Sequence, residues 1–213
     1  MEVFDKEELV FADSNKITGF DIDPMIIKFS SIIGLPNILP LLNMRFFMDF
    51  TQASEDKYIR EKFNTDGLYV FGMKVLSPFM FTEYKLEDIG IDRKYNFEDL
   101  SKLIKTLTDI EKKRKIYIMD ELAYAGRICL DTKGNNRIIN LDTFGNEVIF
   151  YNSSIEQLAL SMSAFCSSQS SQNFVTAMNQ IDPQAIESTD HFWPSAADIL
   201  EDFFYYMDDN SIN

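Results

Sequence analysis

The sequence predicts an α+β protein in which a mainly antiparallel sheet, wound as a meander, is covered by flanking helices. Three observations favour this class. Hydrophobic residues make up 46% of the 213 residues, which is enough for one sizeable core. Short β-rich segments separated by turn residues fill positions 127–152, and a helical pattern of apolar residues follows them directly. A single domain over residues 1–213 accommodates these elements.

The N-terminal part of the chain is expected to contribute one helix and two strands. The helix opens at Pro24, because proline suits a first turn, and ends at Gly34, because glycine is favoured just past a helix end; Pro36 prevents continuation. Two β-rich segments, separated by a polar connector, are expected to be strands: NMRFFMDF (43–50) and LYVFGMKV (68–75).

The clearest helical pattern lies at 96–115. Asn96 can cap its N-terminus, and the basic run at 112–115 meets the negative end of the helix dipole. Its apolar face recurs at helical spacing: Phe97, Leu100, Leu103, Ile104, Leu107 and Ile110. A strand at 116–119 and a turn ending at Gly126 are expected next.

A six-residue phrase then occurs twice, as LDTKGN at 130–135 and LDTFGN at 141–146. A calcium loop is one explanation, but each phrase has a single Asp where an EF-hand needs oxygen ligands at alternate positions and a distal Glu. A repeat architecture needs at least three units. Two hairpin turns explain the spacing better, with Asp and Thr bonding nearby backbone and Gly134 and Gly145 taking positive φ. The sequence therefore predicts a three-stranded antiparallel meander.

Alternation along the middle strand of this meander predicts which face is buried. Ile139 and Leu141 share one parity, so they are expected to face the core. Asn140 and Asp142 take the opposite parity, so their face is expected to be wet.

Helices are expected after the meander. A capping box fits either Ser153 with Glu156 or Ser154 with Gln157, and an apolar stripe follows: Ile155, Leu158, Met162 and Phe165. The serine-rich link at 167–172 is a candidate hinge before a C-terminal helical extension. This extension is expected to form two helical pieces. The second opens at Ser195 after Pro194, and Trp193, the only tryptophan, anchors it in the core.

Motifs that carry catalysis are absent from the sequence. The only histidine, His191, has no nucleophile motif such as GxSxG beside it, and no glycine-rich phosphate loop occurs. Cys129 and Cys166 are far apart, which fits neither a disulfide framework nor a zinc site. Acidic residues are so numerous that chance pairs are certain, and Asp120 with Glu121 is more typical of a solvated turn than of a catalytic dyad. We expect no enzyme activity, no cofactor and no metal.

Charge narrows the choice of partner. The chain has 34 acidic and 20 basic residues, for a net charge of -14. Such a surface repels nucleic acid and anionic membranes and favours a basic partner. The N-terminus does not resemble a signal peptide and no stretch is apolar enough to span a membrane, so a cytoplasmic protein is expected.

Residues 117–165 resemble the core of the SUKH superfamily of bacterial immunity proteins. The resemblance is carried by a Cys-Leu-Asp strand (129–131), a second strand ending in Leu-Asp (141–142) and an Asn-Ser-Ser step into a helix (152–154). IDPQAIESTDHFWPSAADILED (181–202) is similar to the tail of the fourth SUKH subfamily, and IIGLPNILPLLNMRFF (32–47) to the family's early helix and first strand. The family's glycine-rich turn before the Cys-Leu-Asp strand is replaced here by DELAYAG.

The resemblance implies a single SUKH-like domain that binds and neutralises a cognate toxin, often a nuclease, without catalysis. A regulatory or scaffold module with a host protein partner is the alternative. Candidate partner-binding carboxylates are Asp131 and Asp142, which stand at turn ends where backbone is exposed. Asp120, Glu121 and Glu147 flank the same region and extend one acidic patch. The alternative role for Asp131 and Asp142 is to order their own turns.

Overall fold

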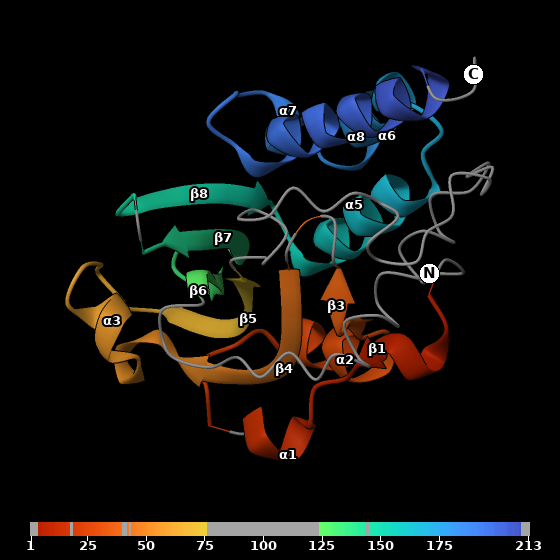
Figure 1. Cartoon of the computed structure of the whole chain (residues 1–213). Coiled ribbons are helices and arrows are strands. Elements are labelled where there is room, and N and C mark those ends of the chain that lie inside the picture. The colour runs from red at the N-terminus through yellow and green to blue at the C-terminus, as the bar shows by residue number, and fades with distance from the viewer. Residues whose placement is uncertain are drawn as a thin grey trace.

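The computed structural model describes residues 4–17, 19–39, 42, 44–75, 124–143 and 145–209. Within them, six antiparallel strands form one sheet in the order β3-β4-β5-β6-β7-β8, and helices pack around it (Figure 1). A separate two-stranded sheet joins β1 to β2. The predicted α+β class with a strand meander is confirmed.

The N-terminal part is organised around helix α2 (Pro24–Ile32). Asp23 caps this helix by accepting a 2.8 Å hydrogen bond from the Met25 N–H. Gly34 lies just past the C-cap residue with a φ of 71°, so both predicted helix ends are confirmed. The shorter elements of this part are η1 (Lys6–Glu8), β1 (Leu9–Val10), α1 (Ser14–Ile17), β2 (Leu35–Pro36) and β3 (Ile38–Leu39).

Two longer strands follow, β4 (Met44–Gln52) and β5 (Leu68–Val75), as predicted. The polar connector between them folds into η3 (Ala53–Glu55) and α3 (Lys57–Arg60). The pairing of β4 with β5 shifts register part-way along, so β4 carries a bulge and bends the sheet.

The three-stranded meander is confirmed as β6 (Tyr124–Asp131), β7 (Arg137–Asp142) and β8 (Glu147–Asn152). The prediction of a turn ending at Gly126 is wrong, because Gly126 lies inside β6 and pairs with Lys74. A Cβ atom on Gly126 would lie 2.4 Å from Asn140 Oδ1, so glycine here makes room for a neighbouring side chain. The helix predicted at 96–115 and the strand predicted at 116–119 lie outside the described residues.

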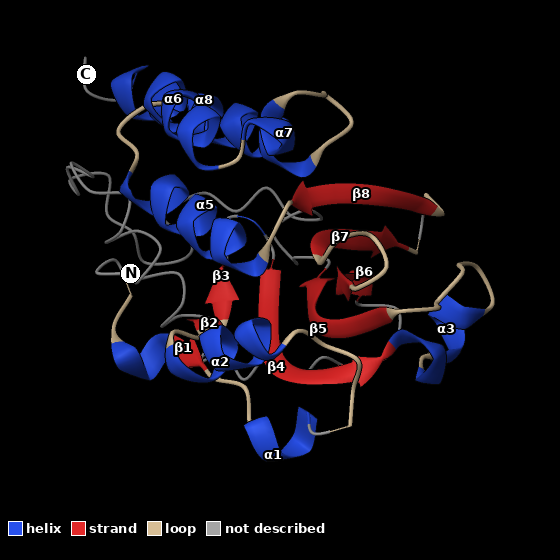
Figure 2. Cartoon of the chain, turned by 180° about the vertical axis from the view of Figure 1, so that it is seen from behind, coloured by secondary structure: helices blue, strands red, loops and turns tan. Residues whose placement is uncertain are grey.

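Four helices follow the meander: α5 (Ile155–Ser167), α6 (Ser171–Ile181), α7 (Pro183–Ile186) and α8 (Phe192–Asp209). Figure 2 shows α6, α7 and α8 grouped beyond β8, with α5 between them and the rest of the molecule. Ser154 caps α5, since its hydroxyl accepts a 3.2 Å hydrogen bond from the Gln157 N–H. All four residues of the predicted apolar stripe on α5 are buried, which confirms this helix.

The C-terminal extension differs from its prediction in two respects. It contains three helices rather than two, and α8 begins at Phe192, three residues before Ser195. Pro194 fits inside the first turn of α8 because backbone N–H groups there have no intrahelical partner. The serine-rich link is also shorter than predicted, because Ser170 caps α6 with a 3.1 Å hydrogen bond from the Asn173 N–H.

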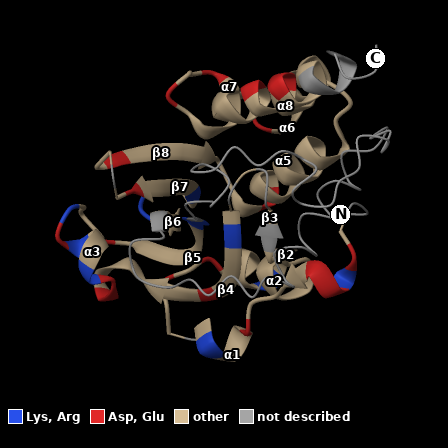
Figure 3. Cartoon of the chain, in the orientation of Figure 1, with Lys and Arg blue, Asp and Glu red and all other residues tan. Residues whose placement is uncertain are grey.

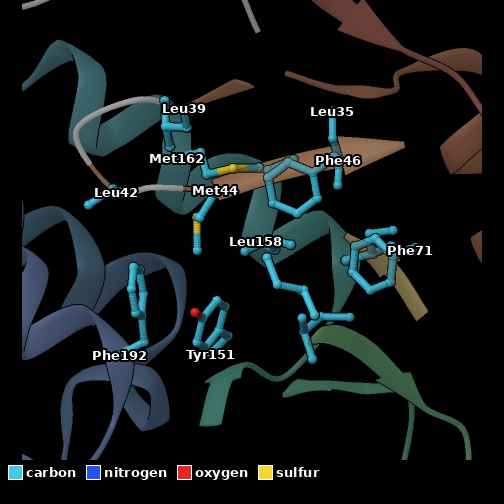
Figure 4. Packing of buried hydrophobic residues seen from close by; sticks show 14 of the residues in the cluster. Leu35, Leu39, Leu42, Met44, Phe46, Phe71, Tyr151, Leu158, Met162 and Phe192 are labelled. Carbon is cyan, nitrogen blue, oxygen red and sulfur yellow. The ribbon is translucent and has the colours of Figure 1, made fainter. Parts of the chain in front are cut away.

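Both faces of the sheet are covered. The main core joins one face to α2, α5, α6 and α8, and Figure 4 shows Tyr151, Phe192, Met44 and Leu158 converging in it. A smaller cluster joins the opposite face to η3 and α3: Ala53, Ile59, Leu68, Val70, Cys129, Ile139 and Leu141. Asn140 shares the parity of Ile138, so it faces the main core and is fully buried. The prediction that its face is wet is therefore wrong.

Candidate partner-binding surface

The described carboxylates among the five predicted to bind a partner do not all come together in one patch. Asp120 and Glu121 lie outside the described residues. Asp131 ends β6, whereas Asp142 ends β7 and pairs with Glu147 at the start of β8. Consecutive turns of a meander lie at opposite ends of the middle strand, so β7 separates Asp131 from Asp142 by roughly 17 Å, at about 3.3 Å per residue. No single patch centred on these turns includes both residues.

Asp131 is engaged within its own turn. Its side chain is buried, with 6% of the residue exposed. One carboxylate oxygen accepts a 2.8 Å hydrogen bond from the Gly134 N–H, and the other accepts a 2.9 Å hydrogen bond from Arg137 Nε. This geometry gives Asp131 the turn-ordering role that the sequence offered as the alternative.

The second copy of the phrase repeats this geometry. Asp142 accepts a 2.9 Å hydrogen bond from the Gly145 N–H, three residues on, just as Asp131 does from Gly134. The repeated Leu-Asp-Thr-x-Gly-Asn phrase is therefore one turn motif used twice. The prediction of positive φ at the two glycines is wrong, because asparagines adopt that conformation instead: Asn135, Asn136 and Asn146, with φ of 62°, 61° and 57°. Asparagine tolerates this region better than most residues.

The turn geometry leaves little of Asp131 for a cation, because both of its oxygens accept hydrogen bonds and Arg137 adds a positive charge. Within the described part of the chain, no group of three or more His, Cys, Asp or Glu side chains is placed to hold a metal ion. That neither phrase binds calcium stays a prediction.

A buried polar network fixes α7 and α8 to the end of β8. Asp182, which precedes α7, accepts hydrogen bonds from the Ser153 N–H at 2.7 Å, the Ser153 hydroxyl at 3.0 Å and Asn152 Nδ2 at 3.1 Å. Asn152 Nδ2 also donates to the Ser161 hydroxyl at 3.0 Å, and Asn152 Oδ1 accepts from Trp193 Nε1 at 2.9 Å. The role predicted for Trp193 as an anchor of the last helix is confirmed.

Two polar side chains, those of Lys74 and Tyr151, lie against Phe192 at the start of α8. Burial lowers the pKa of Lys74, an effect that Asp142 partly offsets, and Lys74 Nζ lies 5.6 Å from the ring centroid of Phe192. Burial also raises the pKa of Tyr151, whose ring stacks on Phe192 with centroids 4.2 Å apart. The Asn140 amide and the Tyr151 hydroxyl have no hydrogen-bond partner among the described residues. Both are fully buried, so they belong to the core and not to a surface that a partner reaches.

Negative charge is concentrated in the C-terminal part of the chain, a feature that the net charge alone does not reveal. After Arg137 the chain contains eleven Asp and Glu residues and no Lys or Arg, so residues 138–213 carry a formal charge of -11 out of the total of -14. Figure 3 shows the consequence, since acidic residues and no basic ones lie along α8 and in the connection that joins α7 to α8. The position of the last basic residue in the sequence would have revealed this asymmetry.

Among the residues of this region whose exposure the structure describes, six carboxylates are exposed, and we call them the acidic surface: Glu147, Glu187, Asp190, Asp198, Glu201 and Asp202. They lie at the start of β8, in the connection from α7 to α8, and along α8. The ring of His191 lies 5.0 Å from the ring of Phe150, which places the end of the α7–α8 connection against β8. Carboxylates therefore lie on β8, on the connection that packs against it and on α8, within a part of the sequence that contains no Lys or Arg.

Apolar side chains accompany the carboxylates on α8. Ile199 is 39% exposed and Tyr205 67% exposed. Tyr205 lies on the helix face opposite the buried residues Trp193, Ala196 and Leu200, and Ile199 lies at the border of that buried face. Exposed aromatic and aliphatic groups ringed by charge are typical of protein-binding surfaces.

Comparisons with known proteins gave no match: no family model, no curated protein and no solved structure is significantly similar to this chain. No described helix is both long enough and apolar enough to cross a membrane.

Proposed function

We propose that this protein is a cytoplasmic immunity protein, which neutralises a cognate nuclease toxin by binding it directly. It acts without catalysis and without a cofactor. The observation that carries the proposal is the acidic surface, which lies in a region of the chain that contains no Lys or Arg and displays Ile199 and Tyr205 on α8.

The charge of this surface suits a nuclease. An enzyme that grips phosphates must display Lys and Arg, and an acidic protein can occupy that surface in place of nucleic acid. Long-range attraction also speeds association, which a protein that must intercept a toxin needs. The exposed apolar groups on α8 supply the area that is desolvated once contact is made.

The SUKH resemblance gives further support, through residues whose structural role is now visible. The Asn-Ser-Ser step (152–154) and the Asp-Pro-Gln-Ala stretch (182–185) of the resembling tail meet through Asn152, Ser153 and Asp182. Trp193, from the resembling tail, joins the same network. The motifs thus hold α7 and α8 in place; three of the six residues of the acidic surface lie on α8 and two lie in the connection between α7 and α8.

The test uses the product of the reading frame that neighbours this gene. We expect that product to be toxic when expressed alone, harmless when co-expressed with this protein, and recovered with it as a stoichiometric complex. Toxicity that persists on co-expression, or the absence of a complex at micromolar protein, contradicts the proposal. Those results would favour the alternative of a regulatory module with a host partner.

A further inference from the structure

We propose that the outer edge of β8 binds an extended segment of the partner protein that carries lysine or arginine, and that this segment adds to the sheet as a further strand. The inference rests on the proposed function, because it specifies how part of the acidic surface recognises its partner. Strand addition supplies affinity through backbone hydrogen bonds and specificity through side chains.

Hydrogen-bond alternation shows which groups of β8 point outward. The Thr132 N–H donates to the Gly67 carbonyl on the β5 side, so in β6 the even-numbered residues face β5 and the odd-numbered residues face β7. In β7, the residues paired with odd-numbered residues of β6 direct their backbone groups to β6, so Asn140 and Asp142 direct theirs to β8. Their partners in β8, Ile149 and Glu147, therefore direct their backbone groups to β7. Val148 and Phe150 therefore direct their backbone N–H and C=O groups away from the sheet.

The described residues cover this edge at its C-terminal end. At the C-terminal end of β8, Asp182 binds the Ser153 N–H and the His191 ring contacts Phe150. Towards the N-terminal end, no described strand pairs with the outer side of Glu147 or Val148, and Val148 is 55% exposed. The stretch that no described strand pairs with is long enough for a segment of about four residues, with backbone hydrogen bonds at Val148 and at Phe150, whose contact with His191 is made by its ring.

The charges around this edge identify the occupant. Edge strands are commonly protected by lysine or proline, and β8 has neither; its charged residue is Glu147. Asp190 precedes His191 at the same edge, and Asp142 pairs with Glu147. Two described cations lie near this hairpin: Lys62, whose Nζ contacts the Thr143 carbonyl in the turn, and Lys74, whose Nζ lies over the Phe192 ring. Burial lowers the pKa of Lys74, and Asp142 is close enough to offset this shift in part. A segment with basic side chains fits this setting, and an acidic one is repelled.

The experiment uses the full chain labelled with ¹⁵N and a peptide probe, acetyl-Val-Lys-Val-Lys-Val-Lys-amide. We expect the probe to shift the amide signals of Val148 and Phe150 and to slow their hydrogen exchange. Val148→Pro should weaken binding by at least about tenfold, because it removes one outward N–H while leaving the bonds to β7 intact. Val148→Ala, the matched control for loss of the side chain, should retain binding within about threefold.

Two further probes keep the inference falsifiable if Val148→Pro does not fold. A peptide with N-methyl groups on alternate residues, and one with Glu in place of each Lys, should both fail to bind. The inference is overturned if the lysine peptide leaves the Val148 and Phe150 amides unchanged, or if either altered peptide binds equally well. It is also overturned if folded Val148→Pro binds like the wild type. These readouts do not involve the toxin, so a failure here is distinct from a failure of the proposed immunity function.

Discussion

The indole Nε1 of Trp193 donates a 2.9 Å hydrogen bond to Oδ1 of Asn152, a residue 41 positions earlier in the chain. The Asn152 amide nitrogen in turn donates to Asp182, which also binds Ser153. Through these contacts the end of the sheet specifies where α7 and α8 lie. Asp182 is almost completely buried, so its carboxylate depends on these donors to replace water.

Removing the Asp182 carboxylate should therefore destabilise the protein more than removing an exposed one. Asp182→Ala leaves the Ser153 N–H and hydroxyl buried without this acceptor, and we expect it to lower the free energy of unfolding by about 3 kcal/mol. The matched control is Asp190→Ala, which removes an exposed carboxylate nearby and should change stability by less than about 0.5 kcal/mol. Urea denaturation followed by circular dichroism measures both. Equal losses in the two variants would contradict the structural role of Asp182.

Sequence patterns predicted the elements that are stabilised by contacts between residues close together in the sequence. The meander was predictable because in each turn a glycine N–H donates a hydrogen bond to the Asp three residues earlier, and α5 was predictable because Ser154 caps an apolar stripe. The burial of Asn140 was not predictable from alternation, because alternation assigns two faces but not what covers each face. Helices distant in sequence cover the Asn140 face, which makes it part of the core. The position of Gly126 inside β6 was unpredictable for the same reason, because this glycine makes room for the buried Asn140 side chain.

The candidate site was predictable only in its chemistry. Acidic composition pointed to a basic partner, but turn position was a poor guide to exposure, as the buried Asp131 shows. The absence of Lys and Arg after Arg137 can be read from the sequence. Which carboxylates of α8 face solvent depends on how the buried side chains of Trp193 and Leu200 orient that helix. Tertiary packing therefore decides which carboxylates a partner meets.

The two copies of the turn phrase should respond differently to the same substitution. A Cβ atom on Gly134 would lie 2.2 Å from Asp131 Oδ2, whereas the nearest atom to a Cβ on Gly145 is Glu147 Cδ at 3.4 Å. We expect Gly134→Ala to cost about 1–3 kcal/mol, because it disrupts the Asp131 contacts. Gly145→Ala should be neutral or stabilising by up to about 1 kcal/mol, since alanine restricts the unfolded chain. Thermal unfolding of both variants tests this, and similar shifts in the two would count against the difference between the turns.

Two aspartates that pair with cations near the turn between β6 and β7 should contribute differently to stability. Asp131 pairs with Arg137 while buried, whereas Asp66 pairs with Lys133 and both side chains are more than 60% exposed. Asp131→Ala should lower the free energy of unfolding by about 2 kcal/mol, because the Gly134 N–H and Arg137 lose their acceptor. Asp66→Ala should cost less than about 0.5 kcal/mol, since solvent screens exposed pairs. Urea denaturation measures both losses of unfolding free energy. A larger loss for Asp66→Ala than for Asp131→Ala would contradict the burial of the Asp131 pair.

Both cysteines should be unreactive in the folded protein. Cys129 and Cys166 are free and buried, and burial raises the pKa of each thiol. A thiol-specific chromogenic reagent at mildly alkaline pH should therefore label them only at the rate of unfolding, and at once in denaturant. Because the folded-state pKa of each thiol lies above its ordinary value of 9.0, the free energy of unfolding should fall as the pH rises past that value. Rapid labelling under native conditions would show that the thiols are accessible.

Binding to the neighbouring-frame toxin should depend on where negative charge is removed. The double substitution Glu201→Gln with Asp202→Asn neutralises two exposed carboxylates on α8 with little change in shape. Because exposed charges act mainly on encounter, we expect the association rate to fall by about three- to tenfold and its salt dependence to weaken, with a smaller change in the dissociation rate. The matched control, Glu55→Gln with Glu61→Gln, removes the same charge next to α3 and should leave association within about twofold. Stopped-flow measurements from low to high salt provide both rates. If the two double variants slow association equally, attraction depends on net charge alone and the acidic surface is not the site of encounter.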